Sequence, residues 1–354
     1  MLLQKSIEFI TADELASRRA LLTLAELHDV VEAAWRDIRD GRAYGGKAVL
    51  SLPEQEFWSF PEVSSLREGF SDERLGWKLS SLYAVNSRHG AVKVIGANAY
   101  NRRLGLPRST STVLLLDKPT LRPIAILDGS GLSAARTGTY ASHILRQCFR
   151  GRGNARLFLF GAGPVARSVV ECLTHSGASL INEIFVRSRT IESAGRFVAE
   201  METRTSIPLC PVTDNLKLRD CEIVITASNA RHPIFEDEEL APNAVSLHLG
   251  GDEVPERYIQ RALRTGVVAC DDIATVSRRN SQTLALHFAR KGLSLESVGP
   301  LLGIRELSSK EEWQADGTGP VCVTCVGLPV LDLYVAEATY EKYRLACEMG
   351  TASA

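Results

Sequence analysis

Two glycines and an alanine stand at the spacing of a dinucleotide-binding turn. Gly161, Gly163 and Ala166 form a G-x-G-x-x-A motif directly after the apolar run RLFLF. In such a turn the glycines let the backbone approach a pyrophosphate, and the small third residue lets the next helix pack on the strand. Pro164 and Val165 would open that helix, whose N-terminal amides face the anion. We predict dinucleotide binding here; the alternative is a glycine turn needed only for packing.

The end of the next predicted strand, FVRSR, bears on the choice of cofactor. An acidic residue there would hydrogen-bond the ribose 2′-hydroxyl of NAD, whereas arginine can accommodate a 2′-phosphate. The stretch holds Arg187, Ser188 and Arg189 and no carboxylate. The sequence therefore favours NADP(H), with NAD(H) as the second choice. The alternative is that these arginines form a solvated strand end or stack on an adenine.

The segments around the motif predict an α/β domain. A helix is expected over about 133–149, and strands and helices alternate after it. The expected elements are helix 165–177, strand 183–188, helix 191–201, strands 221–228 and 244–251, a helix near 255–265 and strand 266–272. Such alternation implies a parallel sheet covered by helices.

The N-terminal third has a different sequence pattern, which predicts one helix followed by short strands. Thr23 and Glu26 form a capping box for an amphipathic helix that Gly41 would end. Short β-like segments between 47 and 127, separated by Gly, Pro and Asn, predict a mostly antiparallel or mixed sheet. The last expected element is one long helix over about 327–350. Its apolar face is expected to include Leu331, Val335, Ala338 and Leu345.

Composition bounds the class of protein. The chain has 354 residues, a formal net charge of −1, 45% hydrophobic and 23% charged residues. We expect two domains, no nucleic-acid partner and no disordered chain. Neither an export signal nor a membrane span is predicted, so the eight cysteines fit a cytoplasmic protein. Cys322 and Cys325 have redox or metal spacing, but no second pair accompanies them, and we interpret them as ordinary thiols in a strand.

A series of ordered motifs resembles the ornithine cyclodeaminase and mu-crystallin family over nearly the whole chain. They are LTLAELHDVVEAAWRDIRDG, VKVIGANAYNRRLGLPRSTSTVLLLD, SAARTGTYAS, FGAGPVA, VITASNARHPIF, LGGDEVPER and VGLPVLDLYVAEA. The resemblance implies a Rossmann domain over 133–321. It also implies an α+β substrate-binding and dimerisation domain from 1–132 and 322–354, hence a homodimer. The expected ligands are NAD(P)(H) and an amino acid or imino acid, without a metal.

Three residues match the family's reaction site. Arg136 corresponds to its carboxylate-binding arginine, and a planar guanidinium suits that group. Lys93 matches the lysine that faces the reacting nitrogen and carboxylate; the alternative is a lysine on the solvent face of an edge strand. Asp252 occupies the motif of the general acid/base, although neighbouring Glu253 complicates the assignment. Without the motif, Arg136 would be interpreted as an exposed helix arginine.

Further contacts are implied around these residues. Thr226, Ala227 and Ser228 resemble the loop under the nicotinamide ribose, and Thr137 could bind phosphate or substrate. In many members a second arginine binds carboxylate; here Lys47 stands in its place and keeps the charge but not the fork.

The end of the chain adds two residues with open roles. Gly327 is expected among the cofactor contacts, and Asp332 matches the same C-terminal motif. Close packing for the glycine and a helix-start charge for the aspartate are equally good explanations.

The resemblance leaves the reaction open. The leading hypothesis is an NADP(H)-linked oxidoreductase at an amino-acid α-carbon, of the ketimine reductase or amino-acid dehydrogenase type. The alternatives are an ornithine-cyclodeaminase-type cyclisation and oxidative cleavage of an N-glutamyl conjugate in siderophore synthesis. A non-enzymatic, NADPH-dependent binding protein like mu-crystallin is the rival from another class.

Overall fold

The computed structural model describes residues 7–71, 74–149, 153–279, 281–311, 313–315 and 317–352. The chain divides into two compact units. The first consists of Met1–Ser71, Leu75–Arg136 and Leu328–Ala354, and the second of Asp72–Arg74 and Thr137–Gly327. No helix within the described residues is long and apolar enough to cross a membrane.

A six-stranded sheet forms the centre of the first unit, in the order β1-β6-β5-β4-β3-β2. All neighbours are antiparallel except β1 and β6. The strands are β1 (Glu8–Ile10), β2 (Tyr44–Ser51), β3 (Lys78–Val85), β4 (His89–Ala97), β5 (Ser109–Asp117) and β6 (Pro123–Asp128). The prediction of a mostly antiparallel or mixed sheet is therefore confirmed.

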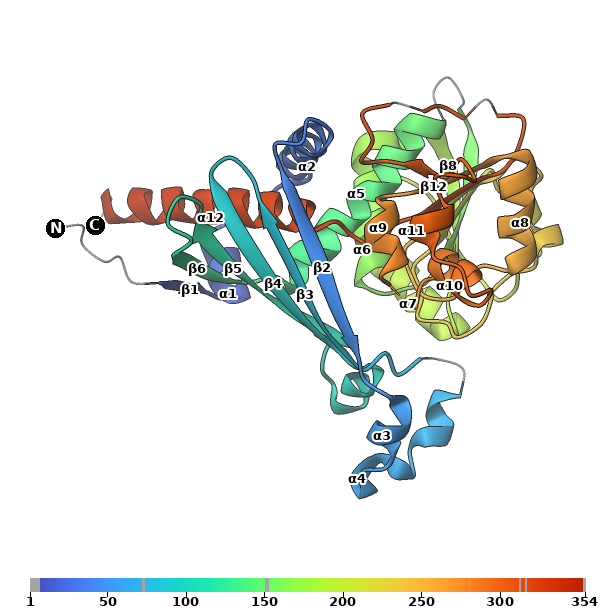
Figure 1. Cartoon of the computed structure of the whole chain (residues 1–354), viewed down its shortest axis with the longest axis horizontal. Helices are drawn as coiled ribbons and strands as arrows, with labels where there is room; N and C mark the ends of the chain where they lie inside the picture. Colours follow the sequence, from blue (N-terminus) through green and yellow to red (C-terminus); the bar gives the residue numbers. More distant parts are fainter. Residues whose placement is uncertain are drawn as a thin grey trace. The chain divides into compact units, whose positions relative to one another are not determined.

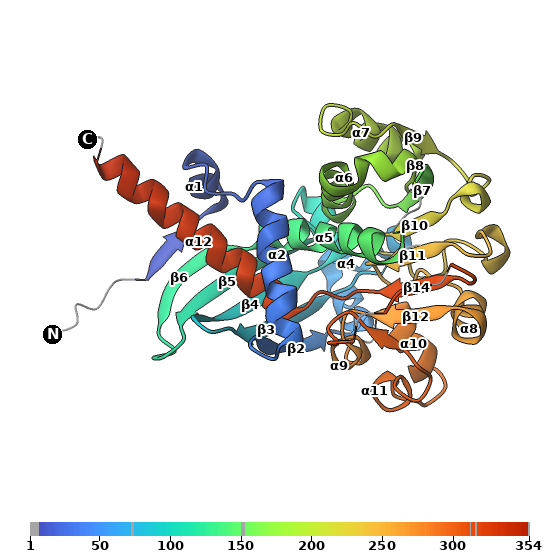
Figure 2. The ribbon, with the colours of Figure 1, turned by 90° about the horizontal axis from the view of Figure 1, so that it is seen from above.

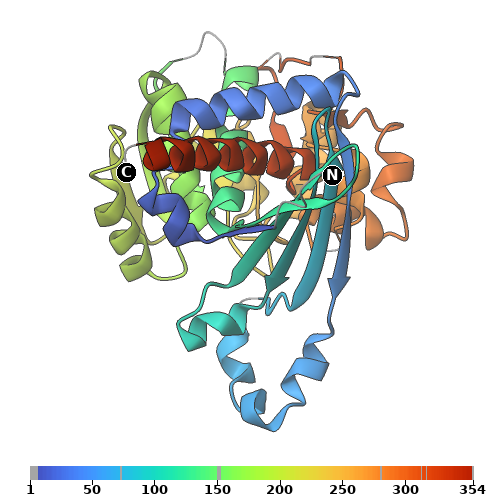
Figure 3. The same ribbon diagram turned by 90° about the vertical axis from the view of Figure 1, so that its left-hand side faces the viewer.

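One face of this sheet is covered by α12 (Pro329–Ala352), which packs beside α2 (Leu24–Arg39), as Figures 2 and 3 show. The capping box that starts α2 is present, with the Thr23 amide 2.7 Å from a carboxylate oxygen of Glu26. On α12, Leu331 is buried, but Leu345 is 59% exposed. The prediction that Leu345 belongs to the buried apolar face was wrong, because only part of the length of α12 packs on the sheet.

A helical insertion between β2 and β3 was not predicted. It holds α3 (Glu54–Trp58), α4 (Pro61–Ser64) and the 3₁₀ helix η1 (Arg67–Phe70), drawn in blue in Figure 3. Its aromatic side chains form a small core together with Leu75 and Ala99. The other helices of this unit are α1 (Ala12–Ser17) and η2 (Ala99–Leu104), and α5 (Ser130–Cys148) begins in it.

The second unit contains an eight-stranded, wholly parallel sheet in the order β13-β12-β14-β11-β10-β7-β8-β9. Its strands are β7 (Ala155–Phe160), β8 (Ile181–Arg187), β9 (Leu209–Val212), β10 (Ile223–Thr226), β11 (Val245–His248), β12 (Val267–Cys270), β13 (Arg305–Glu306) and β14 (Val321–Thr324). The helices are α6 (Pro164–Gly177), α7 (Ile191–Met201), α8 (Glu256–Thr265), α9 (Ile273–Ser277), α10 (Thr283–Ala289), α11 (Leu295–Val298) and the 3₁₀ helices η3 (Ala178–Leu180), η4 (Leu218–Asp220) and η5 (Asp237–Glu239).

Helices cover both faces of this sheet, with α5 and α6 on one side and α8 on the other (Figure 1). Alternation along β10 explains the arrangement, since Ile223 and Ile225 point toward α5 while Val224 joins the core under α8. Strands that are buried on both faces need apolar side chains along their whole length. This explains why RLFLF and the later strands of the parallel sheet contain few polar residues. The predicted parallel α/β fold is confirmed.

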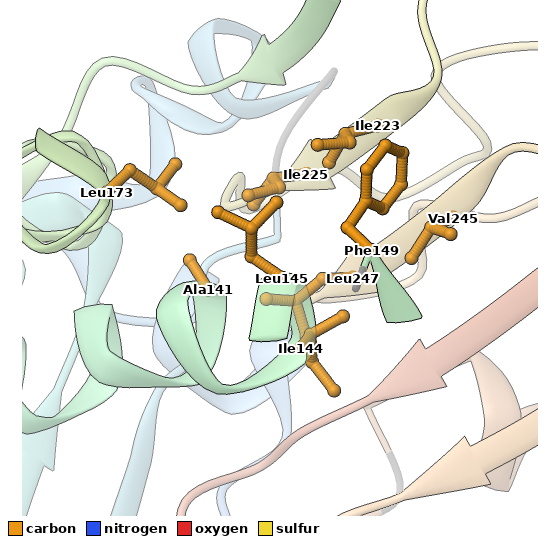
Figure 4. Close-up of a pocket in the computed structure, with 9 residues that line it drawn as sticks. All are labelled: Ala141, Ile144, Leu145, Phe149, Leu173, Ile223, Ile225, Val245 and Leu247. Carbon is orange, nitrogen blue, oxygen red and sulfur yellow. The ribbon is translucent and has the colours of Figure 1, made fainter. Parts of the chain in front are cut away.

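A small cavity remains inside the second unit, between α5, α6, β10 and β11 (Figure 4). It is lined by Ala141, Ile144, Leu145, Phe149, Leu173, Ile223, Ile225, Val245 and Leu247. All nine side chains are apolar, so the cavity offers no group that could bind or transform a polar substrate.

Candidate active site

The glycine turn after β7 has the backbone that its sequence predicts. Gly161 has a φ of +121°, and a Cβ there would lie 2.6 Å from the carbonyl oxygen of Ala227. Its amide donates to the carbonyl of Arg187 at 2.9 Å. Only glycine fits this position, because a side chain would be both strained and in collision.

The start of α6 presents backbone donors. Gly163 is the N-cap residue, and no side chain caps the helix. A Cβ at Gly163 would meet no atom within 4 Å. Pro164 is exposed and Val165 half-buried, whereas Ala166 is fully buried against the sheet. The first amides of α6 have no capping side chain, and there is open space next to Gly163. This arrangement suits an anionic group such as a pyrophosphate.

The two arginines at and just after the end of β8 differ in exposure. Arg187 is half-buried, donates to the side chain of Asn215 and to the carbonyl of Ile234, and lies 5.9 Å from the ring centre of Phe160. Ser188 is half-buried, and Arg189 is exposed. Arg187 is therefore held by contacts within its own unit, and Arg189 is the more exposed of the two.

The loop after β10 is held by a buried carboxyl group that the sequence did not single out for this role. The Thr226 hydroxyl donates to Glu253 at 2.7 Å, and the Ser228 amide donates to it at 2.6 Å. Glu253 is 0% exposed. The pKa of Glu253 is raised above its ordinary value, because the effect of burial is larger than the opposite effect of these hydrogen bonds. Glu253 thus ties the Thr226–Ser228 loop to the segment that carries Asp252.

Asp252 is 2% exposed and is held by two arginines of the same unit. Its Oδ2 atom accepts from Arg74 at 3.1 Å and from Arg290. Its Oδ1 atom is buried and has no hydrogen-bond partner within the described part of the chain. Arg74 and Arg290 were missed, since nothing in SDERLG or LHFAR marks them.

The first unit brings three predicted residues together. Asp332 of α12 accepts from Lys93 of β4 at 2.8 Å and from Nε and Nη2 of Arg136 of α5 at 2.8 and 3.3 Å. Their exposures are 6%, 2% and 5%. β4 lies between β3 and β5, so Lys93 is not on an edge strand. The alternatives of a solvent-facing lysine on an edge strand and of an exposed helix arginine are therefore wrong.

Charge and burial oppose each other in this cluster. The pKa of Lys93 is lowered to about 8: burial is the largest cause, Asp332 opposes it, and Arg136 adds to it. Burial alone would raise the pKa of Asp332, but Arg136 and Lys93 outweigh it and hold the pKa below its ordinary value. The cluster carries two positive charges and one negative charge.

Lys47 lies on the same face of the sheet as this cluster. It pairs with Leu82 of β3, which pairs in turn with Lys93 of β4. Directly paired residues point to one face, and two strand spacings amount to roughly 10 Å. Lys47 is half-buried there, at a distance from Lys93 that allows both to serve one extended anionic molecule.

Two other predicted residues, Thr137 and Gly327, begin and end the long segment of the second unit. Gly327 has a φ of +87°, and its amide donates to Asp271 at 2.8 Å. The same carboxylate accepts from Tyr140 at 2.9 Å, so a residue missed in the sequence fixes this turn. Thr137 is half-buried on α5. These contacts support a packing role for Gly327, and its contact with a cofactor stays a prediction.

The cysteine pair lies in the core. Cys322 and Cys325 are 1% and 2% exposed, and burial raises the pKa of Cys322 to about 12. Within the residues that the structure describes, no group of three or more His, Cys, Asp or Glu side chains could hold a metal ion. A thiol with so high a pKa is a poor nucleophile and a poor ligand.

The model of the ornithine cyclodeaminase/mu-crystallin family matches residues 19–307. The chain belongs to this family. This confirms the resemblance drawn from the ordered motifs and the expectation of an NAD(P)-dependent enzyme. A Δ¹-pyrroline-2-carboxylate reductase of Bacillus cereus is 25% identical over 304 residues, which are 83% of this chain and 90% of the relative.

Solved structures of ornithine cyclodeaminase/mu-crystallin relatives share the fold. The Δ¹-pyrroline-2-carboxylate reductase of Thermococcus litoralis, in complex with NADH and L-proline, has a TM-score of 0.79 at 18% identity and covers 97% of this chain and 98% of its own. An archaeal alanine dehydrogenase dimer with bound NAD has a TM-score of 0.74 at 19% identity, covering 95% of each chain. Both support the Rossmann unit joined to a second domain.

Proposed function

We propose that the protein is an NAD(P)(H)-dependent oxidoreductase that acts at the α-carbon of an amino acid or of a cyclic or secondary imino acid. The observation that carries this is the buried cluster in which Lys93 and Arg136 share the carboxylate of Asp332. Two buried cations beside one carboxylate are suited to bind the carboxylate of a substrate as well. The names of the Bacillus and Thermococcus relatives support the imino-acid class.

The proposed carboxylate contacts follow from donor geometry. Arg136 has a planar fork of donors that matches a carboxylate, and Lys93 adds a point charge that also faces the imine nitrogen. Lys47, on the same sheet face, is placed to serve a second anionic group. Because Lys93 and Arg136 are buried, each contact with a carboxylate gains strength from the low dielectric.

Asp252 is the proposed proton donor and acceptor. Reduction of a C=N bond requires a hydride at carbon and a proton at nitrogen, and oxidation releases the same two. A carboxyl group can exchange that proton with the substrate nitrogen. Its buried Oδ1 atom is the available oxygen, since Arg74 and Arg290 engage Oδ2.

The second unit fits a dinucleotide. Gly161, Gly163 and the amides at the start of α6 would hold the pyrophosphate, and the loop Thr226–Ser228 would lie by the nicotinamide ribose. Thr137 and Gly327 remain proposed contacts. When bound, the nicotinamide supplies or accepts the hydride.

The phosphate preference rests on Arg189. Its side chain is exposed at the end of the FVRSR stretch, where a 2′-phosphate would lie, and Arg187 beside it is half-buried. We propose NADP(H) as the preferred cofactor, although the relatives above hold NADH and NAD. Arg189→Ala should weaken NADPH at least about 10-fold more than NADH, as one charged contact is worth over 1 kcal/mol. Arg196→Ala on α7 is the matched control; equal effects on both cofactors would contradict the proposal.

The homodimer is proposed to form across the open face of the six-stranded sheet. This face exposes Tyr44, Leu50, Leu79, Tyr83 and Val94 at 65%, 59%, 49%, 52% and 45%. An apolar patch of this kind is typical of a subunit interface. Sedimentation of the wild type and of Val94→Lys tests this, with a dimer expected for the first and a monomer for the second.

The decisive experiment follows oxidation of NADPH and NADH with a panel of cyclic imino acids and of 2-oxo acid plus amine pairs. The reverse reaction is followed with proline, lysine, ornithine and N-carboxyalkyl amino acids. Asp252→Asn should lower kcat by roughly 100-fold or more while cofactor affinity stays unchanged. Unchanged turnover would remove Asp252 from the mechanism, and ligand binding without any turnover would support a binding protein instead.

A further inference from the structure

Asp332 holds both cations of the first unit through one carboxylate. Its Oδ1 atom accepts from Lys93 Nζ and from Arg136 Nε, both at 2.8 Å, and its Oδ2 atom lies 3.3 Å from Arg136 Nη2. Asp332 therefore takes the Nε–Nη2 edge of the guanidinium. The Nη1 side of the same plane is turned away from Asp332, because the guanidinium is rigid and flat.

Lys93 is fixed in the same way. An ammonium has three N–H donors, and Asp332 Oδ1 and Ser133 Oγ accept from Lys93 Nζ at 2.8 and 2.7 Å. The third donor direction is set once these two are made. The carboxylate of Asp332 thereby determines where both cations can meet another anion.

We propose that Asp332 is a positioning residue of the amino-acid or imino-acid site, whose carboxylate holds Lys93 and Arg136 ready to receive the substrate carboxylate. This rests on the function proposed above. Asp332 itself need not touch the substrate: it acts through the two cations. The alternative is that Asp332 only stabilises the fold as the counter-charge of two buried cations.

The charge of Asp332 also sets the protonation of Lys93. The charged groups that act on Lys93 are Asp332 from α12 and Arg136 from α5, and the paired strands place Leu82 and Val113 beside it. Asp332 raises the pKa of Lys93. Without the negative charge, Lys93 would lose its proton at lower pH and its hold on a carboxylate would weaken at neutral pH.

The test is the pH dependence of KM and kcat for whichever substrate the panel identifies, in the wild type, Asp332→Asn and Asp332→Glu. In the wild type, KM should rise as the pH passes about 8, where Lys93 loses its proton. In Asp332→Asn, this rise should begin at least about one pH unit lower, and KM at pH 7 should be roughly 30-fold higher. kcat and cofactor affinity should change far less.

Asp332→Glu separates position from charge. It keeps the carboxylate but moves it by one methylene, so KM should rise while the pH of the transition stays near that of the wild type. This variant also decides the matter if Asp332→Asn does not fold, since an unchanged KM in Asp332→Glu would overturn the proposal.

Glu337→Gln is the matched control on the same helix. Glu337 is 2% exposed and accepts from Asn86 at 2.6 Å, with Arg88 also 2.6 Å away. Its substitution should lower stability but leave the KM profile unchanged. An Asp332→Asn profile that superimposes on the wild type would reject the positioning role alone, whereas a wild type inactive with every substrate would reject the proposed function and this role together.

Discussion

Two buried carboxyl groups, one in each unit, are stabilised in opposite ways. Asp332 lies between two cations, and Glu253 lies among neutral donors from Thr226 and Ser228. The pKa of Asp332 is lowered, because Arg136 and Lys93 outweigh burial. The pKa of Glu253 is raised, because burial outweighs its hydrogen bonds. Similar burial therefore gives opposite preferences for the charged form.

The contrast matches the proposed tasks of the two units. In the function proposed above, the carboxylate of Asp332 belongs to a site that also holds a substrate anion, so the charges there are needed in their ionised form. A carboxyl group among hydroxyl and amide donors belongs to a scaffold that holds the loop Thr226–Ser228 without adding a strong charge beside Asp252. Hydrogen bonds from neutral donors offset less of the free-energy cost of desolvating a carboxylate than a neighbouring cation does.

The largest expected effect comes from removing each carboxyl group. Asp332→Leu should lower the free energy of unfolding by about 3–5 kcal/mol, because two buried cations lose their shared counter-charge. Glu253→Leu should cost less, about 1–3 kcal/mol, because it leaves only neutral donors without a partner. Urea unfolding at pH 7 measures both.

Equal losses in these two variants would contradict the idea that cation compensation distinguishes the two carboxyl groups. Removing the largely exposed Arg88, through Arg88→Met, provides a control for ion pairs with one solvated partner. Its expected cost is below about 1 kcal/mol.

A smaller effect of opposite sign is expected at Lys93. Burial lowers the pKa of Lys93 from 10.5 to about 8, so the charged form is disfavoured in the folded protein. Lys93→Met leaves one cation and one carboxylate and should raise the free energy of unfolding by about 1–3 kcal/mol at pH 7. Activity should be lost, because the proposed carboxylate contact is gone.

The sign of this effect can be checked by pH. The penalty for a buried ammonium is fully present below pH 8 and disappears as the pH rises toward 10.5, where Lys93 is neutral in both states. The advantage of Lys93→Met should therefore shrink between pH 8 and 10. A destabilised Lys93→Met at pH 7 would contradict this account, and Lys342→Met, at a surface pair with Glu26, serves as control.

Much of the fold could be predicted from local sequence patterns. The short β-like segments predicted between 47 and 127 correspond to the antiparallel strands β2 to β6, and the capping box placed the start of α2. These features depend on neighbours within a few residues, which a single sequence displays. The glycine turn is of the same kind, because φ at Gly161 is a local requirement.

The contacts that join distant segments could not be predicted. Lys93 meets Asp332 across 239 positions, and Arg74 meets Asp252 across 178. Residue types alone do not show which buried cation meets which carboxylate. The resemblance indicated Lys93, Arg136 and Asp252, but the structure was needed to show that Asp332 links two of them and that Glu253 accepts from Thr226 and Ser228.

The smallest expected effect is a slope with pH at Glu253. Since its pKa is raised from 4.5 in the folded protein, its contribution to stability is fully present below 4.5 and is lost as the pH rises toward the folded value. Glu253→Gln has no charge to lose. The stability of the wild type relative to Glu253→Gln should therefore fall as the pH rises from 4.5.

Glu337→Gln gives the contrasting slope. Its pKa is lowered in the folded protein, so the contribution of Glu337 is complete above 4.5 and is lost only in acid. The difference between wild type and Glu337→Gln should stay level from pH 5 to 8, over which the difference for Glu253→Gln falls. Urea midpoints across this range measure both lines. Parallel lines would mean that Glu253 is held in its charged form after all, and that its neutral donors stabilise a carboxylate as well as the cations around Asp332 do.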